Sequence, residues 1–239
     1  MLQPRHGEAR LSGSRLPEVV RAYLDRCLPD RAAPRRIRVR QEGEMRKAPG
    51  AQPQRFRATQ EFAVGRVEFS WHARFPIVRP IALHVRDEYA DGAGRLSVRL
   101  LGYPIVRARG PEVTAGEALR YLAELPLVPY AMAHNRQLAW RDLEARAVEV
   151  STVVQGKRLA AKLDFDEAGD LVRVSTDERA HQRRGGGFDV LPWGGEYSRY
   201  EVLGGMRMPT VASAYWDTPE GRFVYWSAMV TSAEALGTL

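Results

Sequence analysis

The sequence contains very little cysteine and very little lysine, and each shortage limits what the chain can be. Cys27 is the only cysteine, which excludes an internal disulfide framework and suits a reducing compartment. Only three of the 36 basic residues are lysines, so arginine carries almost all of the positive charge behind the net +7. The arginines are scattered along predicted strands and form no contiguous stripe with aromatic residues, so we do not expect nucleic-acid binding.

A long apolar run is absent from the start of the chain. Residues 1–15 are polar, so they predict neither a signal peptide nor a membrane-spanning helix, and a cytoplasmic location is expected. No linker rich in proline, glycine or serine divides the rest, and 44% of the residues are hydrophobic, enough for a sizeable core. We therefore expect a disordered leader over residues 1–14 and a single domain over residues 15–239.

Recognisable catalytic and metal-binding motifs are missing as well. The histidines are too dispersed for a helical metal-binding pair, and no Gly-x-Ser-x-Gly nucleophile motif occurs. The segment Asp164–Gly169 resembles the start of a calcium-binding loop, but Ala168 at its fifth position offers no ligand, and Ser175 stands at the twelfth position, where that loop needs a bidentate glutamate. A hairpin turn is the favoured interpretation. We accordingly predict no metal, no cofactor and no catalytic residue.

The sequence does contain a long series of regularly patterned segments. Apolar residues at helical spacing first predict a short helix after Ser14, with Pro17 in its first turn and its end before Pro29. From residue 35 the apolar period changes to two, which is typical of strands with one wet face. Asp91–Gly94 separates two such segments and predicts a tight hairpin. The predicted strands are 35–41, 55–63, 67–75, 81–89, 96–101, 140–154, 159–165, 171–175, 197–203, 208–216 and 223–229, with a polar loop over 179–187.

The middle of the chain interrupts this pattern. Thr114 and Glu117 fit a capping box that would begin a helix. Pro126 stops it, and residues 129–135 predict another turn or two, so we expect a helical insert over about 114–136. The predicted fold class is α+β: a strongly curved antiparallel sheet of about ten to eleven strands, forming a half-barrel, with an N-terminal helix and this insert.

A curled sheet capped by helices leaves a concave face, and this face is where a ligand is expected. Alternation along the strands places apolar side chains there, so the natural guest is hydrophobic unless those side chains meet and fill the space. They are Phe69, Trp71, Leu83, Val85, Leu163, Phe165, Tyr225 and Met229.

Large amphipathic groups gather around the insert and the glycine-rich loop that follows. Arg120 and Glu124 are four residues apart on one helical face, where they either pair at the surface or border the mouth of a cavity. Arg183–Gly187 is either an exposed loop or an anion-binding lid with two guanidinium groups. The predicted ligand-binding residues are Arg120, Tyr121, Glu124, Trp140, Arg183, Arg184, Trp193 and Tyr197.

Short motifs occur along nearly the whole chain from Leu16 onward. They are Leu16-Pro17, Gln41–Arg46, Phe69–Trp71, Arg120–Glu124, Pro129, Trp140, Phe165, Gly169, Arg183-Arg184, Trp193, Tyr197, Gly205, Met208-Pro209 and Trp216. This pattern resembles a bacterial family known only as a domain of unknown function. The order of strands and helices is similar to that of the lipoprotein carriers, in which helices cover a half-open β-barrel that holds an acyl chain. Those carriers have signal peptides, and none is predicted here, which weakens the implication of lipoprotein transport.

The leading functional prediction is a binding or carrier protein, without enzymatic activity, for a hydrophobic or acyl-bearing small molecule. The three arginines of the predicted set would meet an anionic head group, and its two tryptophans and Tyr197 would line the entrance. The alternative is an enzyme acting on a small hydrophobic substrate in the same pocket, with Glu124, Asp87 or His181 as general acid or base. The oligomeric state is not predicted.

Overall fold

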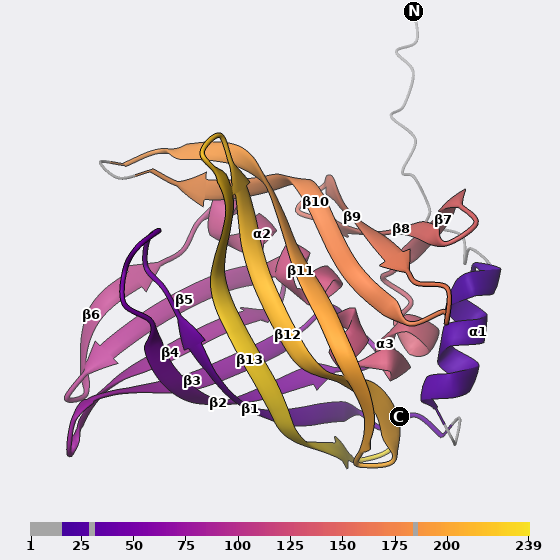
Figure 1. Ribbon diagram of the computed structural model, residues 1–239, viewed down its shortest axis with the longest axis horizontal. Helices are drawn as coiled ribbons and strands as arrows, with labels where there is room; N and C mark the ends of the chain where they lie inside the picture. The colour runs from indigo at the N-terminus through magenta and orange to yellow at the C-terminus, as the bar shows by residue number, and fades with distance from the viewer. Residues whose placement is uncertain (1–15, 29–31, 184–185) are drawn as a thin grey trace, which may run out of the picture.

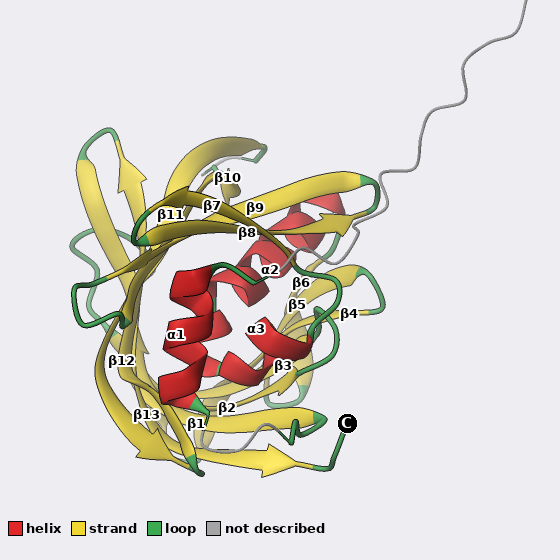
Figure 2. Ribbon diagram, turned by 90° about the vertical axis from the view of Figure 1, so that its right-hand side faces the viewer, coloured by secondary structure: helices red, strands yellow, loops and turns green. Residues whose placement is uncertain are grey.

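One antiparallel sheet organises the chain and curves around its helices (Figures 1 and 2). The computed structural model describes residues 16–28, 32–183 and 186–239, and in these residues the sheet has thirteen strands in the order β6-β5-β4-β3-β2-β1-β13-β12-β11-β10-β9-β8-β7. The strands are β1 Arg36–Met45, β2 Gln54–Ala63, β3 Phe69–Val78, β4 Ile81–Ala90, β5 Ala93–Leu100, β6 Tyr103–Ala108, β7 Ala139–Glu144, β8 Ala147–Val154, β9 Lys157–Phe165, β10 Leu171–Gln182, β11 Phe188–Leu203, β12 Met206–Thr218 and β13 Gly221–Leu236.

The sheet consists of two meanders joined by its first and last strands. Strands that are neighbours in the sheet are also consecutive in sequence, except where β1 pairs with β13 and places Arg36 opposite Leu236. The edges are therefore β6 and β7, and the helical insert connects them across the concave side (Figure 2). The helices are α1 Glu18–Cys27, α2 Pro111–Ala123, the 3₁₀ turn η1 Leu125–Leu127 and α3 Pro129–His134.

The hydrophobic core lies between the concave face of the sheet and these helices. Val20, Tyr23 and Cys27 recur at helical spacing on α1 and are fully buried. The ring of Phe165, one of the predicted inner residues, meets Tyr23 edge-on with 5.7 Å between ring centroids. Helices thus cover the apolar face that the strand pattern predicts. None of the helices in the described ranges is long and apolar enough to span a membrane.

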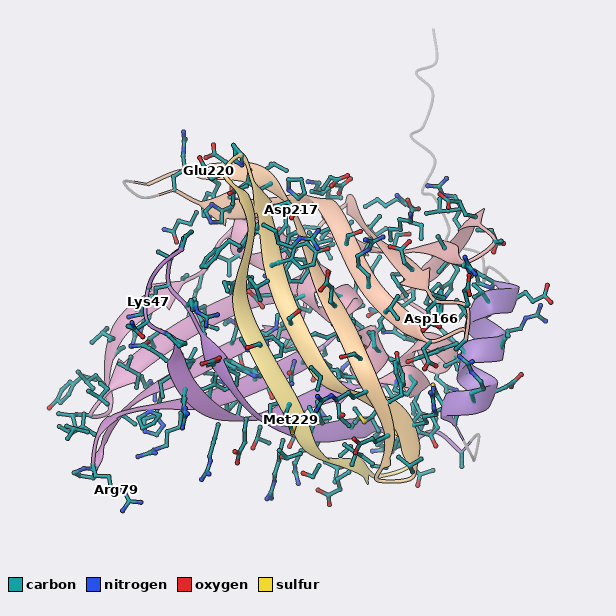
Figure 3. The ribbon with its side chains drawn as sticks, in the orientation of Figure 1. Lys47, Arg79, Asp166, Asp217, Glu220 and Met229 are labelled. Atoms are coloured by element: carbon teal, nitrogen blue, oxygen red, sulfur yellow. The ribbon has the colours of Figure 1, made fainter. Side chains whose placement is uncertain are left out.

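Two predicted turns are confirmed in detail. Asp91 and Gly92 both have positive φ, 52° and 72°, and form a two-residue turn that joins β4 to β5. At the other turn, the Oδ1 of Asp166 accepts the N–H of Asp170 at 2.8 Å (Figure 3). The carboxylate of Asp170 in turn accepts two hydrogen bonds from Arg207, at 2.7 and 2.8 Å. The acidic segment therefore closes the hairpin between β9 and β10.

The strand count of ten to eleven is wrong, because thirteen strands form in the described residues. β6 was missed because nearly all of its side chains are exposed, so its sequence carries no alternation. The predicted strand 140–154 is in fact the hairpin of β7 and β8. The predicted loop 179–187 is shorter, because β10 continues to Gln182 and β11 begins at Phe188.

The predicted start of the central helix is also wrong. α2 begins at Pro111, whose fixed φ and missing N–H suit a first helical position. Thr114 does not cap the helix, because its Oγ1 accepts the backbone N–H of Gly94 on β5 at 3.1 Å. The predicted leader 1–14, with Ser14 before the predicted first helix, lies outside the described residues.

Met229 does not face the concave side as predicted. The pairing of β12 with β13 slips by one residue between Ala214 and Tyr215. Ala214 pairs with Trp226 and Tyr215 pairs with Val224, so Tyr225 is an extra residue on β13. This β-bulge reverses the alternation. Ala228 and Val230 are consequently buried and Met229 is exposed (Figure 3).

Candidate ligand site beneath helix α2

Arg120 is the centre of a buried group of charges on the concave side. Its spacing along α2 places Glu117 and Glu124 on the same helical face, one turn away on either side. The Nε of Arg120 donates to Glu124 Oε1 at 3.0 Å, Nη1 pairs with Asp87 on β4, and Nη1 lies 4.0 Å from Glu117 Oε2. These four side chains, each 11–13% exposed, are called the charge cluster below.

A hydrogen-bonded relay ties the charge cluster to the sheet. Gln60 Nε2 donates to Glu124 at 2.5 Å, Gln41 Nε2 donates to Gln60 Oε1 at 3.3 Å, and Trp71 Nε1 donates to Gln41 Oε1 at 2.9 Å. The Trp71 ring also receives the Arg120 guanidinium at 5.1 Å. A satisfied buried network of this kind fixes the orientation of its members. Arg120 and Glu124 are therefore held in place by protein groups on several sides.

A second arginine, Arg179 on β10, sits beside aromatic rings of the next strands. Its guanidinium carbon lies 3.9 Å from the centre of the Trp193 ring on β11 and 5.8 Å from that of Trp216 on β12. Trp193 Nε1 donates to the Oη of Tyr225 on β13 at 3.1 Å. Across from these strands stands Gly116 of α2, where an added Cβ would lie 3.9 Å from Arg179 Nε. Four adjacent strands and α2 thus surround one cation.

Three buried side-chain atoms in the described residues have no hydrogen-bond partner, and all three belong to this region. They are Asp87 Oδ1, Glu117 Oε2 and Arg179 Nη1. A buried polar group without a partner costs about 1–3 kcal/mol. Arg179 also forms no ion pair with a described carboxylate. A proton on Glu117 joins that carboxyl group to Asp87 in a side-chain hydrogen bond, so the capacity left unused beneath α2 is the donor Nη1 of Arg179.

The surroundings of Glu117 on α2 shift the pKa of its carboxyl group. Burial raises the pKa of Glu117 well above its usual value, the neighbouring Asp87 carboxylate raises it further, and Arg120 and Arg179 partly oppose both. Glu117 consequently keeps its proton to a higher pH than an exposed glutamate does. Glu124 instead accepts hydrogen bonds from Arg120 and from Gln60.

The structure brings some of the predicted ligand residues together. Arg120 and Glu124 belong to the charge cluster, and Trp193 stacks on Arg179. Tyr197 is buried beside them, and its Oη donates to the backbone carbonyl of Ala123 at the end of α2 at 2.7 Å. The predicted Arg120–Glu124 pair forms, but it is buried and not at the surface.

The other predicted residues lie elsewhere. The Oη of Tyr121 donates to the carbonyl of Ala63 at 2.9 Å on the far side of α2. Trp140 is partly buried on the edge strand β7. Arg183 is exposed, 3.7 Å from Asp189, and its backbone N–H donates to Gly187. Arg184 lies outside the described residues.

Residues that the sequence did not single out complete the site. Arg179 was placed in a loop, but it is on β10, just after an irregularity in the β10–β11 pairing between Thr176 and Arg179. That irregularity changes which face the following residues occupy. Glu117 was interpreted as a capping residue. The spacing of Glu117, Arg120 and Glu124 was the one available signal, because it predicts a charged helical face.

The surface of the described residues has two hollows that are not lined by Asp87, Glu117, Arg120 or Arg179. One, of about 720 Å³, involves side chains of β1–β5 such as Arg40, whose neighbours Val39 and Gln41 are buried. The other, of about 640 Å³, involves β8–β12. By this alternation their charged side chains stand on the outer face of the sheet. The predicted open apolar face is occupied by helices, and the charge cluster is closed over by α2.

Several solved structures resemble this one at low sequence identity. A putative outer membrane lipoprotein-sorting protein domain from Vibrio parahaemolyticus has a TM-score of 0.46 and 10% identity, over 91% of this chain and 90% of that one. A LolA superfamily protein from Nitrosomonas europaea has a TM-score of 0.46 and 9% identity, over 92% and 93%. A DUF1329 family protein from Desulfovibrio piger has a TM-score of 0.46 and 8% identity, over 92% and 94%.

The family itself is established by sequence. No curated protein matches the chain. A family model, described as a family of unknown function, matches residues 7–228. The resemblance predicted from the sequence motifs, to a domain of unknown function, is thereby confirmed. The chain belongs to the family of unknown function DUF6544.

Proposed function

We propose that the protein binds an amphipathic small molecule, an acyl or similar apolar chain with an anionic head group, between α2 and strands β10–β13. The observation that carries this proposal is the unused Nη1 of Arg179. A guanidinium with a free donor in a buried place favours a carboxylate or phosphate, because charge-assisted hydrogen bonds are strong where water is excluded.

Arg179 is a better receptor for the head group than Arg120. Arg120 already donates to Asp87 and Glu124, so its role is to hold α2 against the sheet. Arg179 has ring contacts, with Trp193 and Trp216, and forms no ion pair with a carboxylate of the described residues. A ligand anion would supply the partner that it lacks.

The neighbourhood of Arg179 suits an apolar tail. The rings of Trp193, Trp216 and Tyr225 are within reach of the guanidinium or of one another. Gly116 leaves that side of α2 without a side chain. Phe188 and Val190 in the β10–β11 hairpin, at the upper left of Figure 1, are exposed, but they alternate with Leu191 and Trp193 and so lie on the other face of β11. Entry along this hairpin would require α2 and β10 to separate.

Tryptophan fluorescence provides the test, because two tryptophans flank Arg179. A dansylated fatty acid should quench the emission of the wild-type protein, whereas the corresponding uncharged dansyl alkyl amide should quench it weakly. Arg179→Met keeps the stacked shape but removes the donor, and we expect it to weaken fatty-acid binding about tenfold or more. Arg173→Met is the matched control, since Arg173 is on the same strand but exposed and paired with Asp164. Equal affinities for the two variants would refute the proposal.

Native mass spectrometry of the purified protein gives an independent check. A co-purified amphipathic anion should be retained by the wild-type protein and by Arg173→Met, and lost from Arg179→Met. A bound molecule retained equally by all three would place the ligand elsewhere.

One observation favours a second candidate function, an enzyme acting on a small hydrophobic substrate at the same place. Glu117 is buried next to Asp87 with its pKa raised, as a carboxyl group that donates a proton in catalysis requires. His181 is less suited, because its ring is packed against Trp216 at 4.7 Å. Glu124 is also less suited, because it is held by two donors.

The two candidates differ in what becomes of a bound molecule. Its mass should stay unchanged during incubation if the protein is a carrier. A mass change that occurs with the wild-type protein and is abolished by Glu117→Gln would favour the enzyme.

A further inference from the structure

Three turns of the first meander lie at one end of the molecule. They join β1 to β2, β3 to β4 and β5 to β6, and antiparallel order brings them to the same end of neighbouring strands. This end lies at the left of Figure 1, with α1 at the right, and Figure 3 labels Lys47 and Arg79 on the first two turns. We call the second and third turns, with β6, the tip.

The tip is covered with exposed apolar side chains. They are between 44% and 77% exposed, and large apolar groups in soluble proteins rarely gather in this way without a partner. Ile77 and Val78 end β3, Leu101 is in the next turn, and the rest lie on the edge strand β6. The residues are Ile77, Val78, Leu101, Tyr103, Ile105 and Val106.

Arginines surround the tip, and acidic residues avoid it. Neither residues 69–86 nor residues 92–111 contain an aspartate or a glutamate. Arg74 stands opposite His84, which stands opposite Arg99 on the next strand. This row lines the hollow of about 720 Å³ on the outer face of β1–β5. Within the part of the chain that the structure describes, Arg74, Arg79, Arg99 and Arg107 form no ion pair with a carboxylate.

We propose that the tip docks on the surface of an anionic lipid bilayer, with its apolar side chains at the acyl boundary and the arginine row among the phosphates. Arg74 Nη2 donates to the backbone carbonyl of Pro80 at 3.5 Å, so its guanidinium lies beside the turn that carries Val78. Interfacial elements bury their apolar face about 5–10 Å into the boundary between head groups and acyl chains. A guanidinium beside the inserted turn therefore lies at this boundary, where lipid phosphates are within its reach.

The chemistry of the tip distinguishes a bilayer from a nucleic acid. Single-stranded nucleic acids are held by aromatic side chains that stack on bases. The exposed apolar groups here are aliphatic, apart from Tyr103. Aliphatic groups next to arginines that form no ion pair with the described carboxylates match a membrane interface, where burial of apolar area and attraction to anionic lipids act together. This surface is independent of the site beneath α2.

Co-sedimentation with lipid vesicles tests the proposal. The full chain should pellet with vesicles of phosphatidylcholine mixed with phosphatidylglycerol, and weakly or not at all with vesicles of phosphatidylcholine alone. Each arginine near an anionic surface strengthens binding about fivefold, so Arg74→Gln with Arg99→Gln should weaken it about 25-fold. Ile77→Ser with Val78→Ser should weaken it about tenfold or more, because two apolar side chains leave the bilayer.

Matched variants away from the tip provide the controls. Arg21→Gln with Arg136→Gln removes the same charge from exposed positions on α1 and after α3. Val153→Ser with Val202→Ser removes exposed apolar side chains from other strands. Both controls should bind vesicles like the wild-type protein, and circular dichroism should show all variants folded.

Three outcomes would overturn the proposal. The first is a wild-type protein that ignores anionic vesicles. The second is vesicle binding that the controls reduce as much as the tip variants do. The third is a protein that binds a duplex or single-stranded oligonucleotide through these arginines, and whose binding to vesicles is unchanged by Ile77→Ser with Val78→Ser. Self-association through the β6 edge, detected by light scattering in a protein that does not bind vesicles, would overturn the proposal in the same way as the first outcome.

Discussion

Replacing Arg120 by methionine should destabilise the protein strongly and in a pH-dependent way. Methionine keeps most of the length of the side chain, but it removes the guanidinium that lies over the Trp71 ring and leaves Asp87, Glu117 and Glu124 without their shared cation. Removing one partner of a buried ion pair typically costs about 3–5 kcal/mol. In a chain of 239 residues this loss lowers the melting temperature by on the order of 10 °C.

The pH dependence follows from the carboxylates that remain. Without Arg120, burial raises their pKa values in the folded state above those in the unfolded chain. Folding then takes up protons, so the variant recovers stability as the pH falls from neutral towards the unfolded values. The deficit relative to the wild-type protein should be greatest at neutral and alkaline pH and should shrink under mildly acidic conditions.

Urea unfolding monitored by circular dichroism across this pH range measures both effects. Arg38→Met is the control, because Arg38 pairs with Glu61 and Glu234 on the exposed face, and exposed pairs contribute about 0–1 kcal/mol. The account of the charge cluster fails if Arg120→Met unfolds like Arg38→Met, or if its deficit is the same at every pH.

Three further predictions concern neighbouring groups. Glu117→Gln should raise the free energy of unfolding relative to the wild-type protein at alkaline pH and change it little at acid pH. The reason is that the pKa of Glu117 is raised in the folded state, so the wild-type protein loses stability as the pH rises. Urea unfolding midpoints at several pH values would measure this difference. Gly116→Ala should stabilise α2 by up to about 1 kcal/mol and preserve binding of the dansylated fatty acid. Gly116→Leu should abolish that binding, because its side chain fills the space beside Arg179. The fluorescence titration described above measures binding to both variants. Burial raises the pKa of the Cys27 thiol to about 11, so a thiol reagent at mildly alkaline pH should modify it only after unfolding, and rapid labelling of the native protein would contradict its placement.

Hydrophobic alternation and turn chemistry were enough to predict most of the sheet. Asp91 and Gly92 supply the positive φ values of a tight hairpin, and the alternation around Val39 reports one buried face. These signals depend only on residues close together in the sequence, so the sequence of a single segment is enough to reveal them. β6 escaped detection because an edge strand that is exposed on both faces has no reason to alternate.

The candidate site was harder to predict because two irregularities decide which residues face inward. An extra residue at Tyr225 moves Met229 outward, and the slip before Arg179 carries that arginine under α2. Such slips depend on the partner strand, so a single strand's sequence does not reveal them. The pairing of Arg120 with Asp87 joins residues 33 positions apart, which no helical or strand period connects.

The pairing of β1 with β13 has a consequence for how the chain folds. These strands meet at the middle of the sheet although nearly the whole sequence separates them. During synthesis the edge of β1 that pairs with β13 stays unpaired until β13 has left the ribosome. Contacts between such distant segments slow folding, and an unsatisfied strand edge invites association with other chains. We therefore expect nascent or truncated chains that lack β13 to depend on chaperones far more than the finished protein does.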